Sequence, residues 1–187
     1  MKYFFAIVTM IAVLLVMGDV TSAHADQNDN RLDTLFGRLH KTKSFGEATQ
    51  IVQQIWVVWT EYEDEDTYEA MLRGVDAMAG ANYDTALAIF DDVVSRHPAF
   101  AEAWNKRATV YYLMGRFEES LSDVAVTLDL EPRHFGALSG KGLIMMAKGD
   151  FTHAIEAFER ALETNPHMPS IRMRIEKLHE ELDKNAI

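Results

Sequence analysis

Histidine and cysteine are the side chains that most often build metal sites and nucleophilic centres in proteins. This chain of 187 residues has seven histidines and no cysteine. No two histidines lie three or four residues apart, the spacing that puts two metal ligands on one face of a helix. The lack of cysteine excludes disulfides, thiolate zinc sites and cysteine nucleophiles. The sequence therefore predicts no metal site and no cofactor.

The acidic segment 61–69 is the other place where side chains of one chemical type are concentrated. Six of its nine residues are carboxylates, which could bind a cation or act as a catalytic pair. It lacks the Asp-x-Asp-x-Asp-Gly spacing and the turn glycine of a calcium-binding loop. Acidic residues are also favourable near the N-terminus of a helix. We interpret the segment as a solvated linker and keep a cation-dependent or enzymatic accessory protein as the alternative function.

The stretch 136–142 superficially suggests a phosphate-binding loop. It has three residues instead of four between its outer glycines, Gly136 and Gly140, and no serine or threonine follows Lys141. A nucleophile elbow of the form Gly-x-Ser-x-Gly does not occur in the sequence either. With no catalytic constellation, the sequence predicts a protein that is not an enzyme.

Composition narrows the classes of partner. The net charge is −11, from 18 Lys and Arg against 29 Asp and Glu. A protein that binds nucleic acid needs a basic surface, so we expect no nucleic-acid partner. The 48% apolar and 25% charged content is typical of a folded domain.

The first 25 residues have the features of a secretory signal peptide. Lys2 precedes an apolar run over 3–17, and 23–25 supply the small-x-small cleavage pattern. The run is shorter than the roughly 20 apolar residues of a membrane span. We expect cleavage after Ala25 and a periplasmic protein. The alternative is an inner-membrane anchor facing the periplasm, and membrane contact is expected only if the leader is retained.

The prolines mark an internal repeat, because Pro98, Pro132 and Pro166 lie 34 residues apart. Matching positions carry the same kind of residue throughout. The period defines three registers, 67–100, 101–134 and 135–168. The residues that carry the pattern are Gly74, Ala86, Pro98, Trp104, Ala108, Tyr111, Pro132, Gly142, Ala154, Phe158 and Pro166.

Each register reads as two helices with a break between them. Apolar residues recur three and four positions apart on both sides of the break, which is the periodicity of a helix. The break contains Gly80, Gly115 or Gly149, and glycine is favourable at the end of a helix. The proline follows the second helix, which it prevents from continuing. Each register is therefore predicted to be a helical hairpin whose small residues lie where its two helices touch.

These residues resemble the tetratricopeptide repeat (TPR), a 34-residue pattern of Trp, Leu-Gly, Tyr, Ala, Phe, Ala and Pro. The second register matches it best and departs from it at Arg107 and Thr127. The resemblance implies an all-α fold, a right-handed solenoid of antiparallel helix pairs. It assigns one TPR to each register and a capping helix to 169–187. Residues 26–66 then form a degenerate N-terminal TPR-like hairpin and an acidic linker.

In TPR proteins the first helices of successive repeats line a concave groove, and the resemblance transfers those positions to this chain. The implied partner-binding residues are Tyr68, Met71, Val75, Met78, Glu102, Asn105, Thr109, Tyr112, Ser139, Leu143 and Met146. Met71 and Val75 stand where some TPR domains have the residues that clamp a peptide's C-terminal carboxylate, so chaperone-tail binding is not expected. The groove methionines either face a partner or pack against the N-terminal helices, and the sequence leaves both possibilities open.

Trp56 and Trp59 lie in an apolar stretch, 55–59, that the repeat pattern does not explain. A helix that is apolar on all sides is usually buried, so we expect both to be core residues. The sequence as a whole predicts an exported, non-catalytic adaptor that binds a protein or peptide in its groove. It identifies neither the partner nor the oligomeric state.

Overall fold

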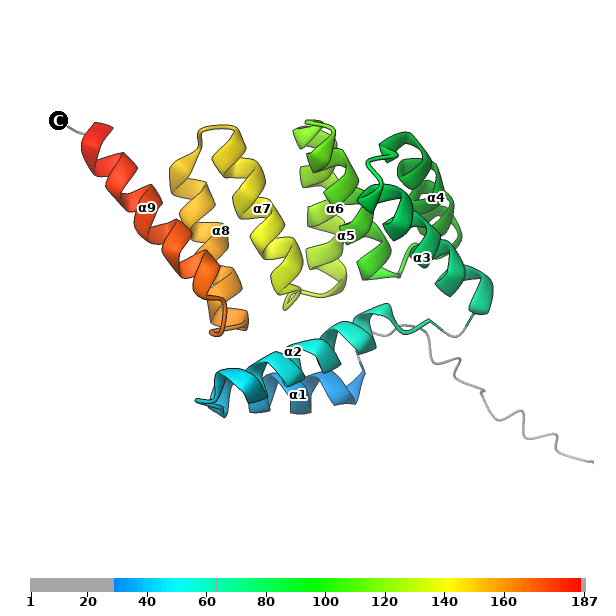
Figure 1. Ribbon diagram of the computed structural model, residues 1–187, viewed down its shortest axis with the longest axis horizontal. Coiled ribbons are helices and arrows are strands. Elements are labelled where there is room, and N and C mark those ends of the chain that lie inside the picture. Colours follow the sequence, from blue (N-terminus) through cyan, green and yellow to red (C-terminus); the bar gives the residue numbers. More distant parts are fainter. Residues whose placement is uncertain (1–28, 63, 186–187) are drawn as a thin grey trace, which may run out of the picture.

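The computed structural model describes residues 29–62 and 64–185, and every regular element in this part of the chain is a helix. The helices are α1 (Asn30–Lys41), α2 (Phe45–Thr60), α3 (Glu65–Ala79), α4 (Tyr83–Arg96), α5 (Ala101–Leu113), α6 (Phe117–Leu130), α7 (Phe135–Ala147), α8 (Phe151–Thr164) and α9 (Pro169–Asn185). Consecutive helices from α1 to α8 form antiparallel pairs, and α9 follows them (Figure 1). The predicted all-α fold of helix pairs is confirmed.

Short polar side chains begin several helices, as expected for N-cap residues. Ser44, Asp64 and Asp150 each accept a hydrogen bond from a backbone N–H in the first turn of α2, α3 and α8. Each cap satisfies a donor that the helix leaves unpaired and contributes about 1 kcal/mol. α9 begins at Pro169, which suits a first helical position because the N–H there has no partner within the helix.

Small residues lie where the two helices of a repeat touch. A Cβ atom added to Gly74 would lie 2.6 Å from the ring of Phe90, and one added to Gly142 would lie 2.4 Å from the ring of Phe158. Both distances are too short for a side chain, so the close approach of the helices depends on glycine. The other small residues that were expected at this contact are also buried: Ala86, Ala108 and Ala154.

Each repeat turns between its helices through one residue with a positive φ angle. Gly115 and Gly149 have φ values of 73° and 79°, and Ala81 has the same role in the first repeat with a φ of 57°. Glycine adopts this left-handed conformation without steric cost, whereas alanine is strained there. The first repeat therefore has a strained turn.

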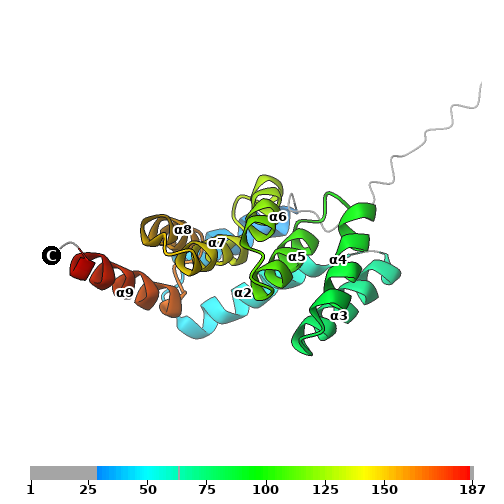
Figure 2. The ribbon, with the colours of Figure 1, turned by 90° about the horizontal axis from the view of Figure 1, so that it is seen from above.

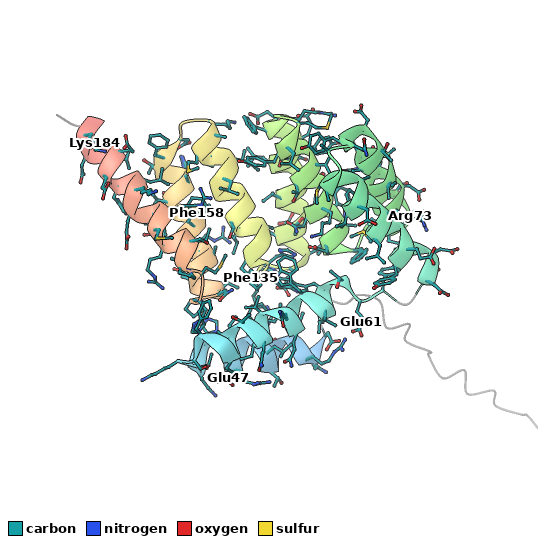
Figure 3. The ribbon with its side chains drawn as sticks, in the orientation of Figure 1. Glu47, Glu61, Arg73, Phe135, Phe158 and Lys184 are labelled. Atoms are coloured by element: carbon teal, nitrogen blue, oxygen red, sulfur yellow. The ribbon has the colours of Figure 1, made fainter. Side chains whose placement is uncertain are left out.

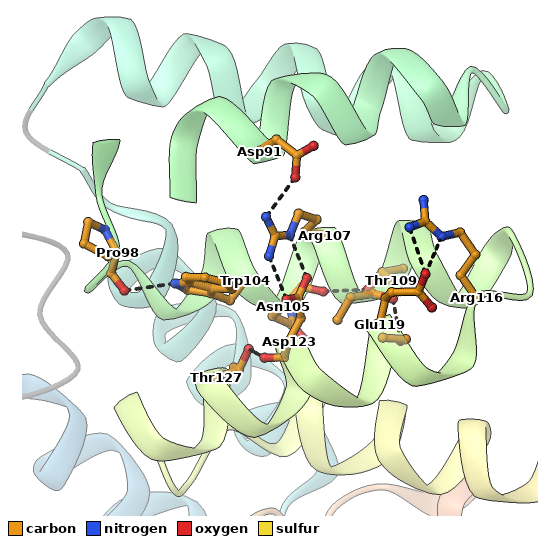
Figure 4. A network of polar contacts seen from close by, with 12 residues as sticks. Asp91, Pro98, Trp104, Asn105, Arg107, Thr109, Arg116, Glu119, Asp123 and Thr127 are labelled. Atoms are coloured by element: carbon orange, nitrogen blue, oxygen red, sulfur yellow. Dashed lines mark hydrogen bonds and ion pairs between the residues drawn. The ribbon is translucent and has the colours of Figure 1, made fainter. Parts of the chain in front are cut away.

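The repeat prolines follow the second helices. Pro98, Pro132 and Pro166 each lie two residues beyond the end of α4, α6 or α8. Trp104 donates a hydrogen bond from Nε1 to the carbonyl oxygen of Pro98 at 2.9 Å, which fixes the first turn of α5 to this junction (Figure 4). Tyr111 lies seven residues beyond Trp104 on α5 and is half-buried.

The pairs α3/α4, α5/α6 and α7/α8 stand side by side in one row with α9 beyond α8 (Figures 1 and 2). Arg107 of α5 joins neighbouring pairs. Its guanidinium binds the buried Asp123 of α6 through contacts of 2.7 and 2.8 Å, and it binds Asp91 of α4 at 2.8 Å (Figure 4). The hydrogen bond to Asp123 is the main reason that the pKa of Arg107 is raised. A residue that departs from the TPR pattern thus connects three helices.

The α1/α2 hairpin lies across the row instead of standing in line ahead of α3 (Figures 1 and 2). α2 contacts α5, whereas neither α1 nor α2 packs extensively against α3 or α4. The loop 61–64 has the same length as the junctions 97–100 and 131–134, so loop length does not impose this placement. The sequence predicts a degenerate TPR-like hairpin and an acidic linker over 26–66, and its pattern gives no sign of the crosswise position.

α9 covers the last repeat with one apolar face. Ile171 and Leu178 are buried in a cluster with Ala154, Ile155 and Phe158 of α8. Within 29–62 and 64–185, no helix is both long enough and apolar enough to span a bilayer. The expected signal peptide, 1–25, lies outside the described residues.

Candidate partner-binding face

The first helices of the repeats, α3, α5 and α7, turn one side away from α4, α6 and α8, and we call this side the inner face (Figure 2). Three large apolar side chains are exposed on it. Tyr68, Leu72 and Leu113 have 46%, 49% and 45% of their surface accessible. Tyr68 and Leu72 are one turn apart on α3, and Leu113 is the last residue of α5.

The other inner-face residues expected on α3 are more enclosed than Tyr68. Met71 is buried in the core cluster that includes Phe90 and Val110. Val75 and Met78 are half-buried against the same cluster. On α3 the structure therefore places one of the two methionines in the core and leaves the other partly accessible.

The inner-face residues expected on α5 and α7 fall into two groups, one buried and one half-buried. Glu102 and Asn105 are buried, so they do not face an open groove. The others are half-buried: Thr109, Tyr112, Ser139, Leu143 and Met146. Leu143 and Met146 pack against the cluster that α8 and α9 share.

Glu102 lies at the centre of a buried polar group. Its Oε2 accepts hydrogen bonds from Nδ2 of Asn105 at 2.8 Å and from Nε2 of His134 at 3.0 Å. Nζ of Lys106 lies 2.7 Å from Oε1. Nδ1 of His134 accepts the backbone N–H of Ala137 at 3.1 Å, so the imidazole proton is on Nε2.

The ionised form of Glu102 is favoured in spite of its burial. Burial alone raises the pKa of a carboxyl group, but the hydrogen bond from His134 and the charge of Lys106 outweigh it. The pKa of Glu102 is therefore below its ordinary value. This carboxylate fixes His134, which in turn contacts the hairpin.

Aromatic rings hold the hairpin against the row. Trp59 stacks on the imidazole of His134, with ring centroids 4.2 Å apart. Trp56 meets Phe135 edge-on at 5.5 Å, and Phe135 lies where α7 meets the hairpin (Figure 3). Lys106 lies over the ring of Trp56. Trp59 is buried and Trp56 is half-buried in this cluster, so the expectation of core residues is met.

Polar contacts fix the other parts of the hairpin. Asp33 of α1 pairs with Arg133 at 2.6 Å. His40, near the end of α1, contacts the carbonyl oxygen of Glu163 at 2.8 Å. Since the hairpin covers the start of α5 and α7, the open part of the inner face consists of α3 and the later turns of α5 and α7.

Leu72 and Leu113 were missed by position counting. The TPR resemblance assigns no groove role to Leu72, and Leu113 is not among the groove residues taken from it. Helical spacing alone could have found Leu72, because Tyr68, Leu72 and Val75 are four and three residues apart on one stripe of α3. Leu113 falls on the corresponding stripe of α5.

In the described part of the acidic segment 61–69, the carboxylates that form contacts do so with separate partners. Glu61 pairs with Arg31, and Glu69 pairs with Arg73 at 3.6 Å. Asp64 caps α3 by accepting hydrogen bonds from Thr67, whose hydroxyl is the main reason that the pKa of Asp64 is lowered. No group of three or more potential metal-binding side chains is found in the described part of the chain.

Helix pairs in a row, with apolar side chains on the open side of the first helices, define an α-solenoid with a surface suited to protein partners. Family models described as tetratricopeptide repeat match residues 71–127 and 135–168. A TPR repeat-containing protein of Rhizobium etli is 33% identical over 156 residues, which cover 83% of this chain and 76% of that protein. The chain belongs to the tetratricopeptide repeat family, whose members mediate protein–protein interactions.

More distant similarities concern the repeats. Hsp70-Hsp90 organizing protein 2 of Arabidopsis thaliana is 22% identical over 130 residues, which cover 66% of this chain but 23% of that protein. The Sgt2 TPR domain of Aspergillus fumigatus superposes with a TM-score of 0.62 at 22% identity, over 66% of this chain and 83% of that one. The first TPR of Spaghetti (RPAP3), solved with the HSP90 peptide SRMEEVD, gives 0.60 at 20% identity, over 63% and 93%. These structures support the TPR solenoid fold.

Proposed function

We propose that this chain is a non-catalytic adaptor that binds an apolar segment of a partner protein on the open part of its inner face. The observation that carries the proposal is the exposure of Tyr68, Leu72 and Leu113 on α3 and α5. Exposed large apolar side chains on neighbouring helices provide the apolar area from which an interaction surface is built. They project from helices that are held in place by packing against α4 and α6, so little conformational freedom is lost when a partner binds.

The chemistry of the inner face favours an apolar segment over an acidic tail. The peptide bound to the Spaghetti TPR ends in EEVD, which carries three carboxylate side chains. In this chain the inner-face cation Lys106 is engaged by the buried Glu102. Met71 and Val75 stand where a carboxylate clamp would need polar or basic side chains. We therefore expect a partner that contributes apolar side chains to α3 and α5.

We also propose that the protein acts after export to the periplasm. The leader pattern of 1–25 supports this, and so does the lack of cysteine, which suits an oxidising compartment. Cell fractionation with N-terminal sequencing tests the proposal. A periplasmic chain that begins at Asp26 supports it, a membrane-bound chain that keeps the leader indicates an anchor, and a cytoplasmic chain contradicts export.

The partner is identified by photocrosslinking in the native compartment. A photoreactive residue is placed at Leu72, at Leu113 or, as a control, at the exposed Thr152 of α8. The proposal expects one protein to be crosslinked from both Leu72 and Leu113 and not from Thr152. Equal crosslinking from all three positions would contradict a site on the inner face.

A further inference from the structure

Among residues 29–62 and 64–185, no helix pair lies beyond the first repeat on the side away from the second. α3 and α4 are at the opposite end of the row from α9, and the hairpin does not cover them (Figures 1 and 2). A depression of about 520 Å³ lies between the two helices. We call this surface the end face. Its lining residues are Ala70, Arg73, Asp84, Thr85, Ala88, Ile89, Asp92 and Arg96.

Arg73 occupies the same repeat position as Arg107, which shows what an arginine does there. Arg107 binds Asp91 of the preceding helix pair and Asp123 of its own pair. The first repeat has Ile89 at the position of Asp123, so Arg73 has no such partner on α4. Its contact with Glu69 is 3.6 Å long, and both side chains are about 60% exposed. An exposed pair of this kind contributes little, so Arg73 can bind a carboxylate from another molecule.

The end face also has small side chains at positions where the second repeat has large aromatic ones. Ala70 and Ala77 occupy the positions of Trp104 and Tyr111. In the second repeat those two rings, together with Arg107, make up the side that faces α4. The smaller side chains of the first repeat leave the depression open to side chains of another helix pair.

We propose that the end face binds the end face of a second copy of this chain about a two-fold axis parallel to α3 and α4. The charges on the two helices favour this partner. α3 contributes the cation Arg73, and α4 contributes the acids Asp84 and Asp92 together with Arg96, which pairs with Asp92 of its own helix. A two-fold axis in this direction sets α3 of each copy over α4 of the other, so each Arg73 faces Asp92 of the other copy and the contact forms twice.

The heights of the residues along the helices match this arrangement. Gly74 lies against Phe90, which places the neighbouring Arg73 close to the level of Asp92. Asp92 binds Arg96 of its own helix through Oδ2. Its other oxygen, Oδ1, is left to accept Arg73 of the second copy.

Charge exchange tests this pairing. Arg73→Asp puts like charges opposite each other at both contacts, and Asp92→Arg does the same with the opposite sign. An equimolar mixture of the two variants can form a heterodimer. One of its two contacts is the wild-type pair of Arg73 and Asp92, and the other has the same two charges exchanged, so both contacts are attractive. Sedimentation velocity of the full chain at physiological ionic strength measures self-association, with Arg174→Asp on the exposed side of α9 as the matched control.

The wild type and Arg174→Asp are expected to dimerise equally as concentration rises. Each end-face variant alone should bind itself at least about a hundredfold more weakly, because juxtaposed like charges cost several kcal/mol. The mixture should regain the wild-type dimer. Ala88→Trp, which fills the depression without changing charge, should also remain monomeric.

Three results would overturn the proposal. They are a wild type that stays monomeric at every concentration, end-face variants that dimerise as the wild type does, and a mixture of folded variants that stays monomeric. Circular dichroism confirms that each variant is folded. If a charge variant does not fold, Ala88→Trp decides the question alone, and a dimer of that folded variant contradicts the interface.

Discussion

The ring of Trp59 lies 4.2 Å from the imidazole of His134, with the two planes inclined by only 10°. Trp59 belongs to the hairpin and His134 to the junction between the second and third repeats. The stack therefore joins two parts of the chain that are far apart in sequence. Since His134 is fixed by Glu102, the position of the hairpin depends on a buried carboxylate of α5.

Removal of the Trp59 ring should loosen the hairpin from the row. Trp59→Ala is expected to lower the free energy of unfolding by about 3 to 5 kcal/mol, since it removes a buried aromatic side chain. Trp59→Phe keeps a ring over His134 and should cost clearly less. Urea unfolding followed by circular dichroism measures both, with Val57→Ala on the exposed side of α2 as the control. Equal losses for Ala and Phe would contradict a role for the stacked ring.

Glu102 should make stability depend on pH. A carboxyl group whose pKa is lower in the folded chain stabilises the fold above its unfolded pKa, and this stability is lost as the pH falls through the folded value. The free energy of unfolding should therefore fall with acidification below about 4.5, the ordinary value for glutamate. Glu102→Gln should make this fall shallower and, at neutral pH, cost about 2 kcal/mol.

The control for that experiment is Glu180→Gln on the exposed side of α9, which removes the same charge without a buried partner. Its pH profile should match that of the wild type. If Glu102→Gln and Glu180→Gln give the same profile, the buried group around Glu102 does not contribute as described.

The turn of the first repeat should be stabilised by glycine. Ala81 has a φ of 57°, which costs alanine about 1 kcal/mol and glycine almost nothing. Ala81→Gly is expected to raise the free energy of unfolding by about 0.5 kcal/mol, because the strain relieved exceeds the extra backbone entropy lost. Gly149→Ala, at the matching position of the third repeat, should lower it by about 1 kcal/mol. Changes of the same sign in thermal unfolding would contradict this account.

The contribution of Arg107 to the free energy of unfolding should come mainly from its pairing with the buried Asp123. Arg107→Leu restores the residue type of the TPR pattern but leaves a buried carboxylate without its partner, at an expected cost of about 3 kcal/mol. Arg107→Leu combined with Asp123→Leu should recover most of that loss. A double-mutant cycle in urea measures the coupling, and additive losses would show that the two side chains do not act as a pair.

The repeats could be predicted from the sequence because their determinants are local. Gly74 and Gly142 lie in the same repeat as the rings they contact, Phe90 and Phe158, and Pro98 and Pro132 lie two residues beyond the helices they follow. The position of the hairpin could not be predicted in this way. The stretch around Trp56 and Trp59 is apolar on several sides, and such a pattern shows that a helix is buried without showing against what.

The packing of the hairpin against the row also explains which predicted groove residues are buried and which surface residues stay exposed. Glu102 and Asn105 hold groove positions in the repeat register, but the hairpin covers them and they bind each other. Leu72 and Leu113 remain exposed because the hairpin does not extend over those parts of α3 and α5. The open surface is thus set by a packing contact between distant segments, which a repeat pattern does not encode.

A binding titration with the crosslinked partner tests the central claim most directly. The triple variant Tyr68→Ser, Leu72→Ser, Leu113→Ser removes the three exposed apolar side chains, and Met173→Ser removes an apolar side chain of α9 that is somewhat more exposed than these. For a folded triple variant we predict binding weaker by at least about a hundredfold, since burying such side chains contributes roughly 1 kcal/mol or more each. Met173→Ser should bind as the wild type does. Unchanged affinity in the folded triple variant would contradict the inner face as the binding site.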